Sequence, residues 1–153
     1  MSEANERIET LIGHLQESSQ SQLFPCPIHL NETASPAMAA SPLTTHVLDT
    51  ALGRPARNLG IAVSYQRPNS QEFDLIAKGA TNRDGRAPGL LTQDQFIAGV
   101  YKIKFDTGSY FKSINTTGFY PYVEVVFEIA DPSQHYHVPL LLSPYSYSTY
   151  RGS

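Results

Sequence analysis

The segment VEVVFEI, residues 123–129, indicates most clearly how this chain folds. Its apolar and acidic side chains alternate: Val123, Val125, Phe127 and Ile129 on one side, with Glu124 and Glu128 on the other. Successive side chains of a strand point to opposite faces, so this period of two predicts a strand with one face on a core.

The same alternation occurs earlier in the chain, in residues 61–66, 73–77 and 101–105. In the second of these runs we expect Phe73, Leu75 and Ala77 to face the core. Turn-forming residues separate the runs at 67–70, 82–85 and 131–133. Several short strands at this spacing predict an all-β fold, an antiparallel sandwich or barrel.

One short helix is expected within this β-rich region. Asp106 is a suitable N-cap, and Tyr110 and Ile114 stand four residues apart, on one helix face. Gly118 and Pro121 then end the helical pattern.

The first 42 residues differ from the rest in charge and pattern. They hold one basic and five acidic residues, a net −4, whereas residues 43–153 hold ten basic and nine acidic ones, a net +1, which gives −3 overall. Ile8, Leu11, Ile12 and Leu15 recur at helical spacing, and residues 18–42 are rich in Ser, Gln, Pro and Ala. We therefore expect a helical tail and linker over 1–42 and a folded domain over 43–153.

Composition excludes several classes of protein. The single cysteine, Cys26, cannot form an internal disulfide. No apolar run approaches the roughly 18 residues of a membrane span, and a net charge of −3 gives no reason to expect nucleic-acid binding. Gly-rich phosphate loops, G-x-S-x-G elbows and cysteine pairs for zinc are also missing from the sequence.

Three histidines of the domain are candidates for chemistry: His46, His135 and His137. His135 and His137 share one strand face, and with His46 they offer three nitrogens for a zinc ion. Such a pair also arises by chance, and a strand histidine is often structural. Arg86, at the end of the turn TNRDGR (81–86), would by itself be a solvated charge.

The C-terminus, residues 140–153, keeps strand-like character almost to its last residue, although chain ends usually fray. The simplest interpretation is an ordered terminal edge strand. The final tetrapeptide, Tyr150, Arg151, Gly152 and Ser153, adds hydroxyl groups, a guanidinium and a carboxylate that a binding site could use.

Four motifs together resemble one known family: LTTHVLD (43–49) with GRPA (53–56), TNRDGR (81–86), and YHVPLLLSP (136–144) continuing to YRGS (150–153). They are similar to the 5-hydroxyisourate hydrolases, the enzyme branch of the transthyretin-like proteins. The resemblance covers essentially all of residues 43–153. It implies a transthyretin-like antiparallel β-sandwich with one short helix, in a homotetramer with active sites in the channel between dimers.

The resemblance also implies an activity, the hydrolysis of 5-hydroxyisourate in urate degradation. The six-membered ring opens at an amide and gives 2-oxo-4-hydroxy-4-carboxy-5-ureidoimidazoline, with no metal or organic cofactor. The implied catalytic residues are His46, Arg86 and His137. His46, Arg86, Tyr150 and Ser153 would bind the substrate, while Arg151 and the Ser153 carboxylate hold the tail.

Chemistry gives each group a role. Imidazoles titrate near neutral pH, so His46 and His137 can share water activation and proton return. Arg86 can bind the oxygens of the substrate and stabilise developing negative charge. Its positive charge should also keep a neighbouring imidazole neutral.

Two other functions are compatible with the same fold: a transthyretin-like carrier of a small ligand, and a metal hydrolase built on the three histidines. The carrier branch lacks the set formed by His46, Arg86, His137 and the YRGS end.

The N-terminal tail contains a candidate targeting signal. Arg7, Ile8, His14 and Leu15 are similar to an N-terminal peroxisomal targeting nonapeptide, which an import receptor reads as a helix. An incidental amphipathic helix is the alternative. Urate oxidation commonly occurs in peroxisomes, which agrees with a peroxisomal location.

Overall fold

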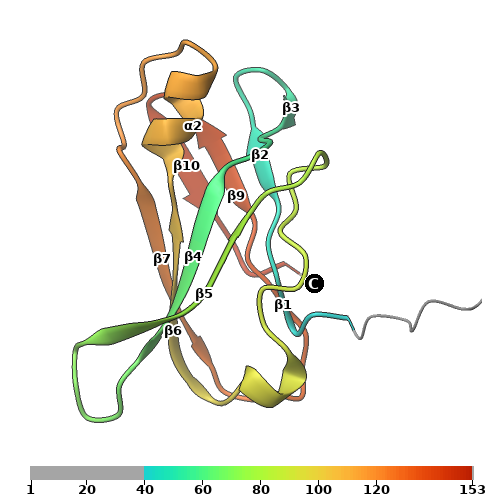
Figure 1. Ribbon diagram of the computed structural model, residues 1–153, viewed down its shortest axis with the longest axis vertical. Coiled ribbons are helices and arrows are strands. Elements are labelled where there is room, and N and C mark those ends of the chain that lie inside the picture. The colour runs from blue at the N-terminus through green and yellow to red at the C-terminus, as the bar shows by residue number, and fades with distance from the viewer. Residues whose placement is uncertain (1–39, 153) are drawn as a thin grey trace, which may run out of the picture. The chain divides into compact units, whose positions relative to one another are not determined.

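Two four-stranded sheets pack face to face in a computed structural model, which describes residues 40–152 (Figure 1). The first sheet is antiparallel throughout and has the strand order β5 (Phe73–Ala80), β4 (Gly60–Gln66), β6 (Gly99–Phe105) and β7 (Val123–Ile129). The VEVVFEI segment is its edge strand β7. The predicted all-β sandwich is confirmed.

The second sheet joins the beginning of the domain to its end. Its order is β10 (Ser146–Thr149), β9 (Leu140–Ser143), β2 (Val47–Asp49) and β3 (Arg54–Pro55). Alongside it, β1 (Leu43–Thr44) pairs with β8 (Tyr136–His137). Both β1–β8 and β2–β9 are parallel pairs within an otherwise antiparallel fold.

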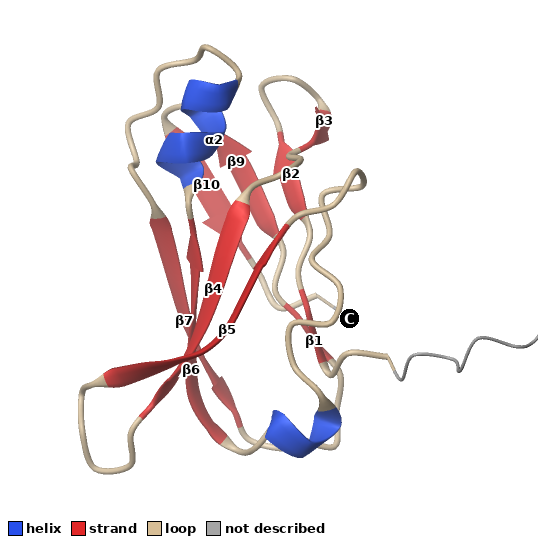
Figure 2. Ribbon diagram, in the orientation of Figure 1, coloured by secondary structure: helices blue, strands red, loops and turns tan. Residues whose placement is uncertain are grey.

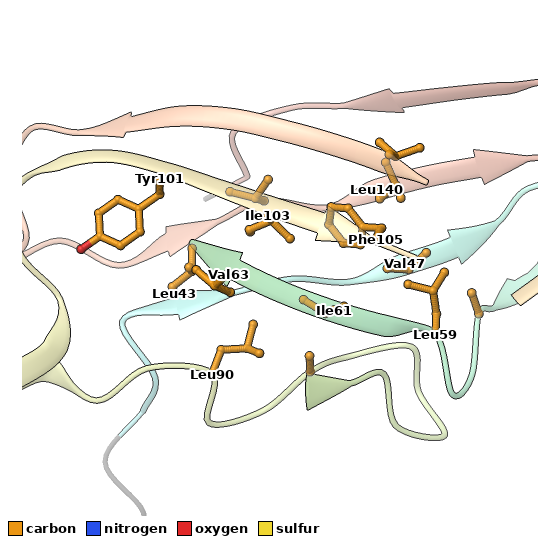
Figure 3. Packing of buried hydrophobic residues seen from close by; sticks show 14 of the residues in the cluster. Leu43, Val47, Leu59, Ile61, Val63, Leu90, Tyr101, Ile103, Phe105 and Leu140 are labelled. Atoms are coloured by element: carbon orange, nitrogen blue, oxygen red, sulfur yellow. The ribbon is translucent and has the colours of Figure 1, made fainter. Parts of the chain in front are cut away.

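The core lies between the two sheets, where side chains from both meet (Figure 3). Val47 and Leu140 of the second sheet and Val63, Ile103 and Phe105 of the first are fully buried. Full burial of such a side chain contributes roughly 1.5–3 kcal/mol, so this layer is the main source of stability.

Strand β5 departs from the predicted pattern. A bulge between Val63 and Ser64 shifts its register, so that Val63 pairs with Ala77 but Ser64 pairs with Leu75. Cross-strand neighbours share a face. Leu75 therefore joins Ser64 on the outer face and is 52% exposed, and Phe73, opposite Gln66, also lies outside, beneath the Lys102 ammonium. The expectation that Phe73 and Leu75 face the core is wrong, because the extra residue of a bulge inverts the alternation beyond it.

The predicted helix is confirmed as α2 (Thr107–Ser113), where the Asp106 carboxylate accepts a hydrogen bond from the Ser109 N–H. A single 3-10 turn, η1 (Gln93–Gln95), lies at the opposite end of the sandwich (Figure 2). Tyr110 of α2 donates its hydroxyl hydrogen to the buried Asp49 carboxylate, which links the helix to β2. None of the described helices is both long and apolar enough to cross a membrane.

The C-terminal segment forms β10 at the edge of the second sheet, as predicted for a terminal strand. All four of its side chains are exposed. The predicted tail helix, the peroxisomal motif and Ser153 lie outside the described residues.

Candidate active site

Thr44 of β1 and His46, just before β2, point away from the core. Their neighbours Leu43, Thr45 and Val47 are fully buried, and alternate residues of an extended chain point to opposite sides. Thr44 and His46 are only partly buried, so a polar row stands on the face opposite the core.

His46 and Arg86 are cross-strand neighbours. They form an isolated antiparallel bridge, closed by the Val47 N–H, which donates to the Gly85 carbonyl at 2.8 Å. On its other side, the His46 carbonyl accepts from the Leu140 N–H at 2.9 Å. Directly opposite residues have Cβ atoms about 5 Å apart, so Arg86 stands beside the imidazole.

A tight turn holds Arg86 in this position. The Asn82 side-chain oxygen accepts hydrogen bonds from the backbone N–H groups of Asp84 and Arg86, at 2.9 and 3.0 Å. Gly85 follows with a φ of +72°, and a Cβ there would lie 2.5 Å from the Val47 carbonyl oxygen. Only glycine fits both the left-handed backbone and the close approach of β2.

His137 lies between two other segments. It pairs with Thr44 of β1 on one side and with Gly152 of the C-terminal tail on the other. The Gly152 N–H donates to the His137 carbonyl at 2.9 Å, and the Thr44 hydroxyl oxygen lies 2.9 Å from Nδ1 of the ring. The tail thus returns to pair with β8, on the side of His137 opposite β1.

The electrostatic setting favours neutral imidazoles. Burial lowers the pKa of His46, and the positive charge of Arg86 lowers it further, against an opposing effect of Asp84. Burial and then Arg86 also lower the pKa of His137, with smaller contributions from His135 and His46. The predicted effect of Arg86 on a neighbouring imidazole is confirmed, and it acts on both histidines.

The terminal residues fall into two groups. Arg151 lies over the Tyr136 ring, with its guanidinium carbon 4.9 Å from the centroid, and donates to the Gln134 side-chain oxygen at 3.1 Å. These are the contacts of an anchor for the tail. Tyr150 is 57% exposed and lines a hollow of about 290 Å³ with Val125 and Phe127. Its described contacts do not reach His46, Arg86 or His137.

The sequence singled out three groups that the fold brings together, and missed those that hold them. Thr44 contacts His137 and Asn82 contacts Arg86, but a threonine and a turn asparagine carry no signal without knowledge of strand pairing. Gly152, which contacts His137, was singled out only as part of the terminal tetrapeptide. Within residues 40–152 no three His, Cys, Asp or Glu side chains are placed to hold a metal ion. The geometry therefore offers no ligand set for the zinc alternative.

Comparisons with known proteins agree with this arrangement. The model of the HIUase/Transthyretin family matches residues 43–152. The 5-hydroxyisourate hydrolase of Mus musculus is 54% identical over 117 residues, which cover 76% of this chain and 99% of the mouse protein.

Two solved structures show the same fold. Sea bream transthyretin, solved in complex with thyroxine, superposes with a TM-score of 0.69 at 38% identity, covering 72% of this chain and 94% of that one. An (S)-allantoin synthase superposes with a TM-score of 0.66 at 42% identity; the match covers 72% of this chain but only 43% of the synthase, less than half its length. By motif, fold and identity, this chain belongs to the HIUase/Transthyretin family.

Proposed function

We propose that this protein hydrolyses 5-hydroxyisourate, opening the ring at an amide. The observation that carries the proposal is the pairing of Arg86 with His46 beside His137, in a setting that lowers the pKa of both imidazoles. A neutral imidazole near working pH is a competent base, and a fixed guanidinium is a competent oxyanion partner. The 54% identity to the mouse hydrolase supports the same substrate.

In this mechanism one imidazole takes a proton from water as the oxygen attacks the ring carbonyl. The carbonyl oxygen becomes negative, and Arg86 stabilises that charge. As the C–N bond breaks, a protonated ring nitrogen returns a proton to the leaving nitrogen. His46 and His137 are the candidates for these two steps, because burial and Arg86 lower the pKa of both imidazoles.

The test is an absorbance time course on freshly prepared 5-hydroxyisourate, which also decays without enzyme. Purified protein should accelerate the decay in proportion to its concentration, and His137→Asn should abolish most of that acceleration. Decay at the rate of buffer alone would refute the proposal.

A carrier is the alternative function, favoured by the superposition on transthyretin bound to thyroxine. Two observations support the enzyme instead: identity is higher to the mouse hydrolase, and the His46–Arg86–His137 set is present. Calorimetric titration with thyroxine separates the two, since a carrier binds this ligand without turning over 5-hydroxyisourate.

We also propose that the chain works as a homotetramer. Arg86 is exposed and both imidazoles are only partly buried, so a single chain leaves the reacting groups open to water. Closing a site against water strengthens its electrostatic interactions, and a second copy is a suitable cover. Val126 and Tyr147, on edge strands β7 and β10, are 57% and 41% exposed and suit burial against another copy. Light scattering on the purified protein measures the assembly.

Tyr150 and Ser153 complete the proposed substrate site. Tyr150 carries a free hydroxyl on an exposed side chain, and Gly152 bridges to His137, which brings the end of the chain to the candidate base. Tyr150→Phe should raise KM more than it lowers kcat, because it removes a hydrogen bond to substrate and leaves the histidines in place.

A peroxisomal location is proposed from the tail motif alone. Arg7, Ile8, His14 and Leu15 would bind the import receptor. A fluorescent reporter fused to residues 1–30 should enter peroxisomes, and the same fusion with Arg7→Ala and Leu15→Ala should not. A diffuse cytosolic signal from the unaltered fusion would contradict the assignment.

A further inference from the structure

The hydroxyl of Thr44 lies between two imidazoles. Its oxygen is 2.9 Å from Nδ1 of His137 and 3.0 Å from Nε2 of His135. The Tyr136 carbonyl, at 3.5 Å, is beyond the usual 2.5–3.0 Å range of O–H···O bonds, so the two rings are the main partners of this hydroxyl.

The backbone fixes this arrangement. In the parallel pair β1–β8, Thr44 is in register with His137, and His135, two residues earlier, shares the same face. The Tyr136 N–H donates to the Pro42 carbonyl and the Val138 N–H donates to the Thr44 carbonyl, both at 2.9 Å. These backbone hydrogen bonds hold β1 and β8 together before and after Thr44.

A hydroxyl has one proton and two lone pairs, so it can accept from one imidazole while donating to the other. In the first arrangement His137 Nδ1–H donates to Thr44 Oγ1, whose own hydrogen points to His135 Nε2; His137 then has a free lone pair on Nε2. In the second, His135 Nε2–H donates to Thr44, which donates to His137 Nδ1; His137 then carries its hydrogen on Nε2.

We propose that Thr44 and His135 form a proton relay that switches His137 between these two states, with exposed His135 exchanging protons with solvent. The proposal rests on the proposed hydrolysis, in which a proton is first removed from water and then returned to the leaving nitrogen. Thr44 and His135 touch no substrate and act only through His137.

The protons balance over one cycle. As the water oxygen bonds to the carbonyl carbon, Nε2 of His137 takes a proton from that water. Nδ1 of His137 then passes its proton to the Thr44 hydroxyl, and Thr44 passes its original proton to Nε2 of His135. Nδ1 of His135 releases a proton to solvent. As the C–N bond breaks, Nε2–H goes to the leaving nitrogen and the chain runs in reverse, with His135 Nδ1 taking a proton from solvent. The new carboxylic acid then ionises, which accounts for the one proton released overall.

The surroundings agree with a relay. Burial, and then the charges of Arg86, His135 and His46, lower the pKa of His137, which favours passing an added proton onward. His135 is exposed, as a group that exchanges protons with water must be. Thr45, the next residue, makes a useful contrast, since its hydroxyl points to the buried side and donates to the Val138 carbonyl at 2.7 Å.

The experiment measures kcat and KM on 5-hydroxyisourate for His135→Gln, Thr44→Val and Thr44→Ser, over a series of imidazole concentrations at fixed pH and ionic strength. For His135→Gln, kcat should fall about a hundredfold with KM unchanged, the lower end of the range that proton transfer contributes, and should recover as imidazole increases. Thr44→Val should lose a similar factor, whereas Thr44→Ser, which keeps the hydroxyl, should retain most of the activity.

Thr45→Val is the matched control: it lowers the melting temperature but should leave kcat independent of imidazole. A wild-type kcat for His135→Gln, or a loss that imidazole does not restore, overturns the relay while wild-type hydrolysis still stands. No hydrolysis by the wild-type protein overturns the proposed function, and the relay with it.

Discussion

Gly152 is pressed against the ring of His137. A Cβ built at position 152 would lie 2.5 Å from His137 Cδ2 and 3.2 Å from its Cβ and Cγ, closer than side-chain carbons approach. The glycine of the C-terminal tail therefore fixes where the imidazole stands, in addition to the hydrogen bond from its N–H.

Gly152→Ala should disable the enzyme without unfolding it. The added methyl group displaces the imidazole, and a displacement of about 1 Å can cost about a hundredfold in rate. We expect kcat/KM to fall at least tenfold while the melting temperature hardly changes. Gly60→Ala is the control, because its Cβ would meet only Asp106 Cβ at an ordinary 3.5 Å. Equal activities in the two variants would refute this role for Gly152.

His46→Asn and His137→Asn should each lower kcat by about 10²–10⁴-fold, the usual contribution of general acid–base catalysis. If the two rings share one proton-transfer task, the double variant should lose far less than the product of the two factors. A double-mutant cycle on kcat measures this coupling. Strict multiplication of the two losses would mean that the histidines act independently.

Arg86→Gln should change the pH dependence of the reaction. Burial and Arg86 keep the pKa of both imidazoles below the usual value, so the wild-type base form persists below pH 6.5. Removing the charge raises both pKa values, and the acid limb of log(kcat/KM) should move to higher pH, beyond any overall loss of rate. Arg83→Gln, which removes an exposed charge from the same turn, should leave the limb in place.

Deletion of residues 150–153 should abolish activity and leave the protein folded, in the same oligomeric state as the full chain. Of the deleted residues that the structure describes, Gly152 donates one backbone hydrogen bond to His137, and Arg151 contacts Gln134 and covers the ring of Tyr136 from outside, so no buried apolar side chain is removed. Circular dichroism and light scattering should match the full chain. If the deletion dissociated the assembly, loss of activity would no longer identify the tail as part of the site.

Tyr110→Phe should affect stability alone. The phenol is buried and donates to the Asp49 carboxylate at 2.9 Å, so its removal should cost about 1–3 kcal/mol of unfolding free energy. Burial and then Asp49 raise the pKa of Tyr110 to about 12, so its contribution should disappear as pH rises from 10 to 12. Urea unfolding at pH 7 and pH 11 tests both points, with kcat at pH 7 unchanged.

The sequence allowed the strands and the helix to be predicted because each has a local signature. Alternation identified β4, β6 and β7, and the Asp106 cap identified α2. The outward turn of Leu75 was not predictable, since it depends on where a bulge interrupts pairing between two strands. Likewise, the parallel pairings β1–β8 and β2–β9 join residues far apart in the sequence.

The site shows the same division. His46, Arg86 and His137 could be named from motifs, because their chemistry is distinctive. Thr44 could not, and Gly152 was singled out only within the terminal tetrapeptide, because the role of each depends on the strand with which it pairs. The position of Tyr150 relative to the histidines follows from the pairing of β10 with β9, which a local pattern does not show.

The pairing of β1 with β8 also bears on how the protein is made. Thr44 and His137 are 93 residues apart, so their strands can meet only after most of the chain has left the ribosome. Closing so long a loop costs conformational entropy that local contacts do not offset, and such long-range strand pairs form slowly. Gly152 pairs with His137 from still further along the chain, so the site can be completed only after that segment, too, has left the ribosome.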